Sequence, residues 1–130
     1  MTTRVLIIED EEIQRRVLAL GLAAEGFEVE SAGSVPAAMA LLSSGHFDAA
    51  LVDLLLPGAS GVELARTIHA SSPGIAIVLM SAYHLSEEHI ARLNVGAVGF
   101  IPKPYRMQEI ARFLREKLNQ GPGSARASSA

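Results

Sequence analysis

The chain has 130 residues, 49% of them hydrophobic, and a formal net charge of −3. This length gives one domain, and the composition excludes intrinsic disorder over most of it. The acidic balance argues against direct nucleic-acid binding, which usually needs a basic surface. The absence of cysteine excludes disulfides and thiolate metal sites.

The first residues do not look like an export signal. Arg4 is followed by only four apolar residues, 5–8, and then by four acidic residues, 9–12. A signal peptide needs a longer apolar region. Residues 67–86 carry no formal charge, but serine, proline and glycine interrupt this stretch, so it does not predict a membrane span. We therefore expect a cytoplasmic protein without membrane contact.

Short apolar runs alternate with amphipathic segments along the chain. Runs rich in valine, isoleucine and leucine predict strands at residues 5–8, 28–31, 49–54, 75–80 and 99–102. Helical spacing and capping residues predict a helix after each strand, at residues 13–24, 35–44, 60–69, 86–94 and 106–119. The expected buried face of the first helix consists of Ile13, Val17, Leu18, Leu20 and Leu22.

This alternation predicts an α/β fold, with a parallel sheet covered by helices on both faces. Pro102 has no backbone N–H, so we expect the last strand at an edge of the sheet. Residues 1–120 form the predicted domain. Residues 121–130 are small and polar, which predicts a disordered tail or the stub of a linker.

Polar residues stand where the predicted strands end. Glu9 and Asp10 follow the first strand, Asp53 lies at the end of the third, Ser81 follows the fourth and Lys103 follows the last. In open parallel sheets the functional crevice lies outside the carboxyl ends of the strands. Taken singly, each residue would more often be a helix cap, a turn residue or a surface charge, but together they predict one site.

These residue types favour phosphoryl chemistry. Carboxylates held close together repel one another unless a cation lies between them. Mg²⁺ is bound by one or two carboxylates, together with water and phosphate oxygens. A lysine ammonium and a serine hydroxyl can bind phosphate oxygens, and a carboxylate can act as the nucleophile that forms an aspartyl-phosphate.

Four stretches resemble the receiver domain of bacterial response regulators in two-component signalling. They are VLIIEDEE (5–12), FDAALVDLLLPGASGVEL (47–64), IAIVLMSAY (75–83) and GAVGFIPKPY (96–105). The resemblance extends over about residues 4–119. It implies the flavodoxin-like receiver fold, a five-stranded parallel sheet of order 2-1-3-4-5 flanked by five helices. It also implies a signalling phospho-acceptor that catalyses only its own phosphorylation and dephosphorylation.

The resemblance assigns the phospho-acceptor and the metal ligands. Asp53 would accept the phosphoryl group from a histidine kinase or a histidine phosphotransfer protein. Glu9, Asp10 and Asp53 would bind Mg²⁺ together with the backbone carbonyl of Leu55, with Asp10 the principal direct ligand. Glu9 stands where many receivers have an aspartate.

Further roles concern the bound phosphoryl group. Lys103 and Ser81 would contact its oxygens, and Ser81 and Phe100 would form the switch. The Lys103–Pro104 bond is expected to be cis. Leu55 and Tyr83 lie two residues after Asp53 and Ser81, and we expect them to keep water from the phosphoryl group and lengthen its lifetime.

The resemblance also implies partners. The kinase or phosphotransfer protein would dock near the first helix, and an unknown downstream protein target would bind the fourth helix, the last strand and the last helix. We expect a stand-alone receiver or a phosphorelay member, either monomeric or a phosphorylation-dependent dimer, and a receiver from a longer regulator remains an alternative.

Other classes of function compete with this one. A phosphorylation-independent receiver-like binding module stays open. Dehalogenase-type phosphohydrolases need a second acid two residues after the nucleophile, where this chain has Leu55. The P-loop motif is missing from the sequence, and the acidic loops lack the serine-, threonine- and glycine-rich phosphate cradle of a flavodoxin-like cofactor binder.

Overall fold

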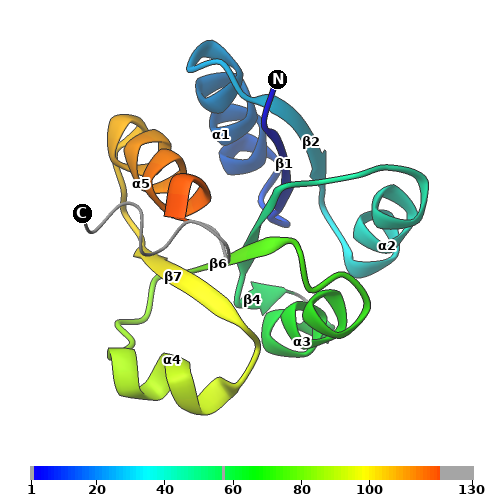
Figure 1. Ribbon diagram of the computed structural model, residues 1–130, viewed down its shortest axis with the longest axis vertical. Coiled ribbons are helices and arrows are strands. Elements are labelled where there is room, and N and C mark those ends of the chain that lie inside the picture. The colour runs from blue at the N-terminus through cyan, green and yellow to red at the C-terminus, as the bar shows by residue number, and fades with distance from the viewer. Residues whose placement is uncertain (1, 57, 121–130) are drawn as a thin grey trace.

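The computed structural model describes residues 2–56 and 58–120, so the prediction for residues 121–130 lies outside the described part. Within it, a parallel sheet has the strand order β2-β1-β3-β6-β7 (Figure 1). Its strands are β1 (Arg4–Ile8), β2 (Glu28–Ala32), β3 (Ala49–Asp53), β6 (Ala76–Ser81) and β7 (Ala97–Pro102). The predicted order 2-1-3-4-5 is confirmed, because β6 and β7 are the predicted fourth and fifth strands. The edge position of the last strand is confirmed too.

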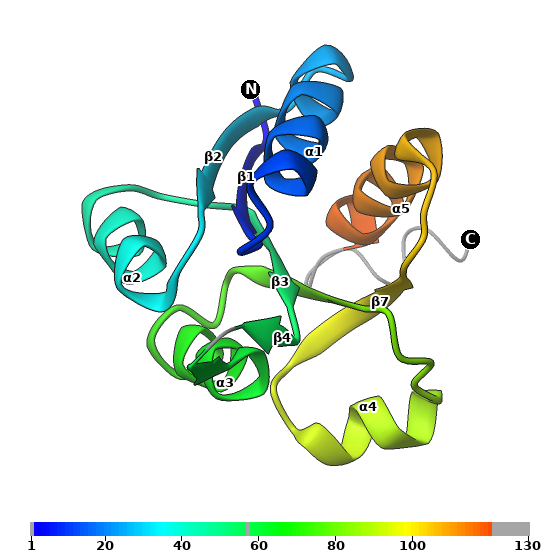
Figure 2. The same cartoon turned by 180° about the vertical axis from the view of Figure 1, so that it is seen from behind.

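Helices cover both faces of the sheet. Helices α1 and α5 lie on one side, and α2, α3 and α4 lie on the other (Figures 1 and 2). Their bounds are α1 (Glu12–Ala24), α2 (Val35–Ser44), α3 (Gly61–Ser71), α4 (Glu87–Leu93) and α5 (Met107–Gln120). The predicted α/β architecture is therefore confirmed.

Alternating side chains of the strands form two separate cores. In β1, Val5 and Ile7 pack toward α1 and α5, whereas Leu6 and Ile8 pack toward α2 and α3, and all four are fully buried. Burial of one such side chain stabilises the fold by about 1.5–3 kcal/mol. Burial on both faces holds the strands firmly, so the residues at their carboxyl ends occupy fixed positions.

The buried face predicted for α1 is wrong for three of its five residues. Leu18 and Leu22 are buried, but Ile13, Val17 and Leu20 are 76%, 57% and 71% exposed. The helix contacts the core with a narrow stripe, and helical spacing alone does not say which apolar residues belong to it. Because these three residues are exposed, α1 carries an apolar surface made of Ile13, Val17 and Leu20.

A short hairpin that the sequence did not predict follows β3. Strands β4 (Leu55–Leu56) and β5 (Ala59–Ser60) pair antiparallel, and the chain then enters α3 at Gly61. The Gly61 N–H donates to the carbonyl of Leu54 at 3.2 Å. A Cβ at position 61 would lie 2.2 Å from the Asp53 carbonyl oxygen, so only glycine fits without a shift of the backbone.

Three serines cap helices. The hydroxyls of Ser34, Ser60 and Ser86 accept hydrogen bonds from the first turns of α2, α3 and α4. Where β6 pairs with the edge strand β7, a bulge lies between the pairs Ile77–Ala97 and Val78–Gly99. The Lys103–Pro104 bond that follows β7 is cis, as the resemblance implied.

Candidate phosphoryl-acceptor site

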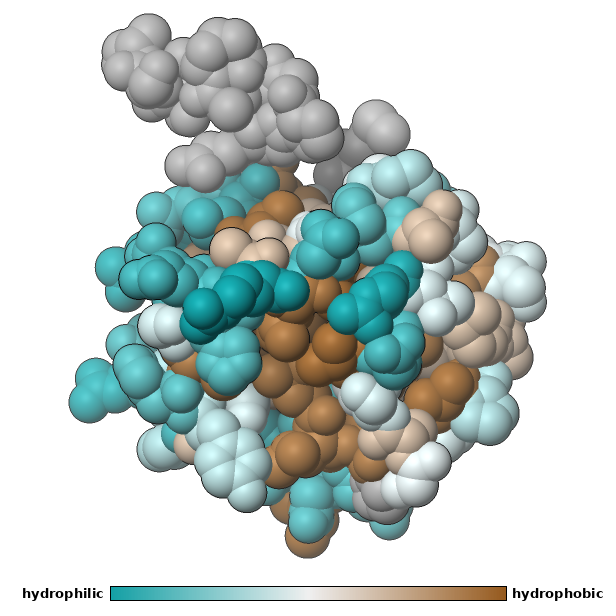
Figure 3. Space-filling model, turned by 90° about the horizontal axis from the view of Figure 1, so that it is seen from below, coloured by the Kyte–Doolittle hydropathy of each residue, from teal (hydrophilic) through white to brown (hydrophobic). Residues whose placement is uncertain are grey.

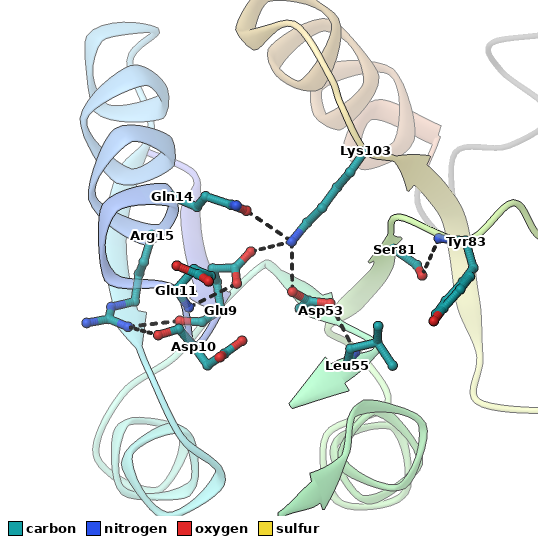
Figure 4. Close-up of polar contacts among 10 residues, drawn as sticks. All are labelled: Glu9, Asp10, Glu11, Gln14, Arg15, Asp53, Leu55, Ser81, Tyr83 and Lys103. Atoms are coloured by element: carbon teal, nitrogen blue, oxygen red, sulfur yellow. Dashed lines mark hydrogen bonds and ion pairs between the residues drawn. The ribbon is translucent and has the colours of Figure 1, made fainter. Parts of the chain in front are cut away.

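The polar residues predicted from the strand ends meet at the carboxyl edge of the sheet (Figure 4). Glu9 follows β1 and is fully buried, while Asp53 and Ser81 are the last residues of β3 and β6 and are 5% and 1% exposed. Asp10 is half-buried, and Lys103 comes directly after β7. Parallel strands end at the same edge, which explains how residues so far apart in the sequence come together.

Lys103 lies in the middle of this cluster. Its Nζ is 2.6 Å from Glu9 Oε1 and 2.8 Å from Asp53 Oδ2, and it donates to Gln14 Oε1 at 3.2 Å. The Lys103 side chain is only 18% exposed. Water and salt screen such a pair less than they screen a surface pair. The ammonium group therefore compensates the charge of two buried carboxylates at once.

Backbone N–H groups bind the remaining oxygens of the same carboxylates. The Leu55 N–H donates to Asp53 Oδ1 at 3.0 Å, and the Glu11 N–H donates to Glu9 Oε2 at 3.1 Å. Each of the two carboxylates thus has a donor on both oxygens. Their orientation is fixed before any ligand binds.

Burial and pairing shift two pKa values in the site. Burial raises the pKa of Glu9 above its usual value, although hydrogen bonds from Lys103 and the Glu11 N–H act in the opposite direction. Burial by itself would lower the pKa of Lys103, but hydrogen bonds to Asp53 and Glu9 outweigh it and raise this pKa. Lys103 therefore stays charged at any pH near neutrality.

The acidic residues form a set of oxygen donors that suits a hard cation. One carboxylate oxygen from each of Glu9, Asp10 and Asp53 lies within 4.8 Å of the other two. Among the described residues, the Asp10 carboxylate has no hydrogen-bond or ion-pair partner. Oxygen ligands of this kind, with one carboxylate still available, fit Mg²⁺ better than a softer metal.

The two residues assigned to the switch lie apart from the ion pairs. The Ser81 hydroxyl accepts a hydrogen bond from the Tyr83 N–H at 3.0 Å, so it is held by its own loop (Figure 4). Phe100 is half-buried on β7 and packs against the core beneath α3 and α4. Among the described residues, neither side chain forms a hydrogen bond or ion pair with Glu9, Asp53 or Lys103.

Leu55 and Tyr83 lie on the surface beside the site. Leu55 is 54% exposed and borders a shallow cavity of about 280 Å³ together with Asp10. Tyr83 is 66% exposed. Leu55 thus lies next to the acidic cluster, whereas most of the Tyr83 ring is in contact with solvent.

Sequence reasoning missed two residues that support the site. Gln14 is the third hydrogen-bond partner of Lys103 Nζ. One guanidinium nitrogen of Arg15 donates to the backbone carbonyls of Glu9 and Asp10 at 2.9 and 3.3 Å. These two hydrogen bonds stabilise the backbone that carries the two acidic side chains. Both residues lie in the first turns of α1, where polar side chains are ordinary, so the sequence held no signal that separated them from surface residues.

Comparison with known proteins identifies the relatives of this chain. Residues 5–115 match the response regulator receiver domain family. Sensory transduction protein RegX3 from Mycolicibacterium smegmatis is 34% identical over 119 residues, which is 92% of this chain and 52% of that protein. Response regulator MprA from Mycolicibacterium vanbaalenii is 28% identical over 92% of this chain and 52% of its own length. The chain thus spans about half the length of the curated relatives it matches.

Solved structures resemble the fold closely. A CheY-like receiver domain protein from Methanospirillum hungatei has a TM-score of 0.85 and 30% identity, over 92% of this chain and 96% of that one. TrrA from Thermotoga maritima, solved in complex with Mg²⁺-BeF, has a TM-score of 0.78 and 27% identity, over 88% of this chain and 98% of that one. The chain belongs to the response regulator receiver domain family.

Membership in this family sets the general role. Receiver domains are signalling proteins rather than classical enzymes, and they bind Mg²⁺ at an acidic pocket. Response regulators receive signals from histidine kinases and act on downstream targets. No helix in the described residues is both long enough and apolar enough to cross a membrane.

Proposed function

We propose that this receiver accepts a phosphoryl group on Asp53 in a Mg²⁺-dependent reaction and then changes the surface formed by α4, β7 and α5. One observation carries the proposal. Lys103 Nζ lies 2.8 Å from a buried Asp53 that ends a central strand, and Glu9 and Asp10 lie beside it. This arrangement combines a nucleophile, a phosphate-binding cation and metal ligands.

Glu9, Asp10, Asp53 and the backbone carbonyl of Leu55 would hold the Mg²⁺. The bound ion would neutralise negative charge on the transferring phosphoryl group. The Leu55 N–H orients the Asp53 carboxylate, and Lys103 is close enough to contact a phosphoryl oxygen. Phosphoryl transfer depends mainly on such positioning and charge compensation.

The proposed donor is the phosphohistidine of a histidine kinase or of a histidine phosphotransfer protein. An Asp53 carboxylate oxygen attacks the phosphorus, a P–O bond forms and the P–N bond breaks. The electron pair of the broken bond stays on the imidazole nitrogen. The negative charge of the new aspartyl-phosphate gives Lys103 and the Ser81 hydroxyl an additional hydrogen-bond acceptor.

The exposed apolar surface of α1 supports docking of that donor beside the site. Ile13 and Val17 line a cavity of about 470 Å³ together with Lys103 and Tyr105. An amphipathic helix of a partner can bury such a surface. Docking there would bring the donor to the side of the site on which Lys103 lies, and we place this exchange in the cytoplasm.

The surface proposed to change on phosphorylation is the one formed by α4, β7 and α5. A groove of about 630 Å³ lies between α4, β7 and α5, and Phe100 and Phe113 are among its lining residues. Reorientation of Phe100 would change the shape of this groove. We propose that a downstream protein target, or a second copy after phosphorylation, responds to that change.

Labelling with a small radioactive phosphodonor in the presence of Mg²⁺ tests the acceptor. Asp53→Asn should abolish acid-labile labelling, because the amide is a poor nucleophile of the same size. Asp48→Asn, at the opposite end of β3, is the matched control and should label like the wild type. Undiminished labelling of Asp53→Asn would place the acceptor elsewhere, and an unlabelled wild type would favour a phosphorylation-independent binding module.

A further inference from the structure

Helix α4 packs loosely against the rest of the protein. It has seven residues, and none of them is buried. Its apolar side chains Ile90 and Leu93 are only partly buried against the core. Figure 3 views the side of the molecule on which α3 and α4 lie, and hydrophobic side chains form a strip between hydrophilic ones there. With so little burial, a few individual contacts determine where α4 lies.

One of these contacts joins the end of α4 to α3. Arg66 of α3 donates from a guanidinium nitrogen to the backbone carbonyl of Leu93 at 2.9 Å. Glu63, one turn earlier in α3, forms an ion pair with the same guanidinium group at 2.5 Å. The last carbonyls of a helix have no partner within the helix, and a positive charge near them is favourable. Arg66 supplies both a donor and a charge.

A second contact lies just beyond the helix. Gly96 has φ of +70° and lies against His69 of α3, so close that a Cβ at position 96 would be 2.3 Å from His69 Nδ1. Val95, which lies between Leu93 and Gly96 in the chain, is fully buried. We call Arg66 and His69 with Leu93 and Gly96 the α3–α4 contact. Helix α3 itself is firmly held, because Leu64, Ala65 and Ile68 are buried.

In the part of the chain that the structure describes, the amino end of α4 has no comparable contact. Residues 82–84 and Ser86 are exposed, and they connect α4 directly to Ser81. Among the described residues, the side-chain hydrogen bond of the first turn is a local cap, in which the His89 N–H donates to the Ser86 hydroxyl. The two ends of α4 are therefore held unequally.

We propose that the α3–α4 contact is a pivot: Arg66 keeps the carboxyl end of α4 in place while a change at Ser81 moves its amino end and the loop 82–86. Arg66 is a positioning residue for the switch. It touches neither Asp53 nor the metal ligands. The trigger of the movement rests on the proposed function, whereas the α3–α4 contact stands on this structure alone.

Amide hydrogen exchange of the unphosphorylated protein tests the contact without any ligand. In Arg66→Met, exchange of the amides of residues 90–94 should be about five- to tenfold faster, the change expected for loss of one ordinary hydrogen bond. Arg66→Lys should recover part of the protection, because it keeps the charge. Arg92→Met is the matched control: Arg92 lies in the last turn of α4 but has no hydrogen bond or ion pair among the described residues. Equal exchange in Arg66→Met and wild type, or equal acceleration in Arg92→Met, would overturn the proposal.

Chemical-shift mapping with Mg²⁺ and beryllofluoride then tests the pivot. Shifts of the Asp53, Leu55 and Ser81 amides report binding of the phosphate mimic. In the wild type, amides 82–90 should shift more than amides 93–96, and Arg66→Met should remove this contrast. If the site amides shift and 93–96 shift as much as 82–90 in the wild type, the pivot is refuted. If the site amides do not shift, the proposed function fails, and the exchange experiment alone decides whether Arg66 fixes α4.

Discussion

Lys103 Nζ lies 2.6 Å from Oε1 of Glu9, a carboxylate with no solvent exposure. The same ammonium group contacts Asp53. A buried carboxylate without a cation nearby is costly. In the absence of metal, Lys103 therefore makes the close approach of the acidic residues tolerable, and the same ammonium group is the one proposed to bind the phosphoryl group.

Removal of this cation should destabilise the metal-free protein. Lys103→Met leaves Glu9 and Asp53 without their ion pair, so we expect a loss of about 1–3 kcal/mol in the free energy of unfolding. Added Mg²⁺ should restore part of it, because the ion replaces the missing positive charge. Urea denaturation with and without Mg²⁺ measures both effects. Lys117→Met is the control, and Mg²⁺ should not affect its stability more than that of the wild type. Equal stability of Lys103→Met and wild type would contradict this account.

Metal binding should depend on Asp10 far more than on Ser81. The Asp10 carboxylate is the one without a partner among the described residues, whereas the Ser81 hydroxyl is held by the Tyr83 N–H. Calorimetric titration with Mg²⁺ should show a large loss of affinity in Asp10→Ala and a small one in Ser81→Ala. EDTA should abolish labelling of the wild type. Labelling that is equal with and without Mg²⁺ would rule out the assignment of these ligands.

The lifetime of the phosphorylated form should depend on position 55. Leu55 lies beside Asp10 and has no group that can orient a water molecule for attack on phosphorus. Positioned polar groups contribute about 10²–10⁴-fold in general acid–base catalysis, and Leu55→Asn should shorten the lifetime by a smaller factor. Tyr83→Glu should have the weaker effect, because Tyr83 is 66% exposed. Loss of label over time measures both, and an unchanged decay in Leu55→Asn would refute the role of Leu55.

Alkaline pH should destabilise the fold. Burial raises the pKa of Tyr105 above its usual value of 10.0, and the pKa of Lys103 is raised because its hydrogen bonds to Asp53 and Glu9 outweigh burial. Above about pH 10 the unfolded chain loses these protons while the native state keeps them, so the free energy of unfolding falls as pH rises. Denaturation between pH 8 and pH 11 measures this slope. Tyr105→Phe should reduce it, and an identical slope in the variant would exclude the tyrosine contribution.

Much of the fold could be predicted because central parallel strands are buried on both sides. The apolar runs that contain Leu6, Leu51 and Leu79 leave few structural alternatives, and the residues that follow such strands necessarily share one edge of the sheet. The site residues at strand ends were therefore accessible from the sequence. Their roles in phosphorylation remain predictions.

The parts that escaped prediction depend on contacts between distant segments. Ile13 and Leu18 look alike in a helical pattern, yet one is exposed and the other buried, since only the sheet determines which stripe of α1 it contacts. Gln14 and Arg15 act through hydrogen bonds to Lys103 and to backbone carbonyls. Surface polar residues are common, and the sequence does not show which of them find such partners.

The close approach of Gly61 to Asp53 separates a fixed property of the site, the position of Asp53, from an adjustable one, the side chain at position 55. The carbonyl oxygen of Asp53 leaves no room for a side chain at position 61, so the end of β3 lies directly against the start of α3. Leu55, in the hairpin between them, is exposed, so other side chains fit at that position without disturbing the core. If the role proposed for Leu55 holds, substitutions at position 55 would change how long the phosphoryl group persists, while the position of Asp53 would stay constant. An engineer could therefore randomise position 55 to seek variants with different lifetimes of the phosphorylated form, and leave Gly61 unchanged.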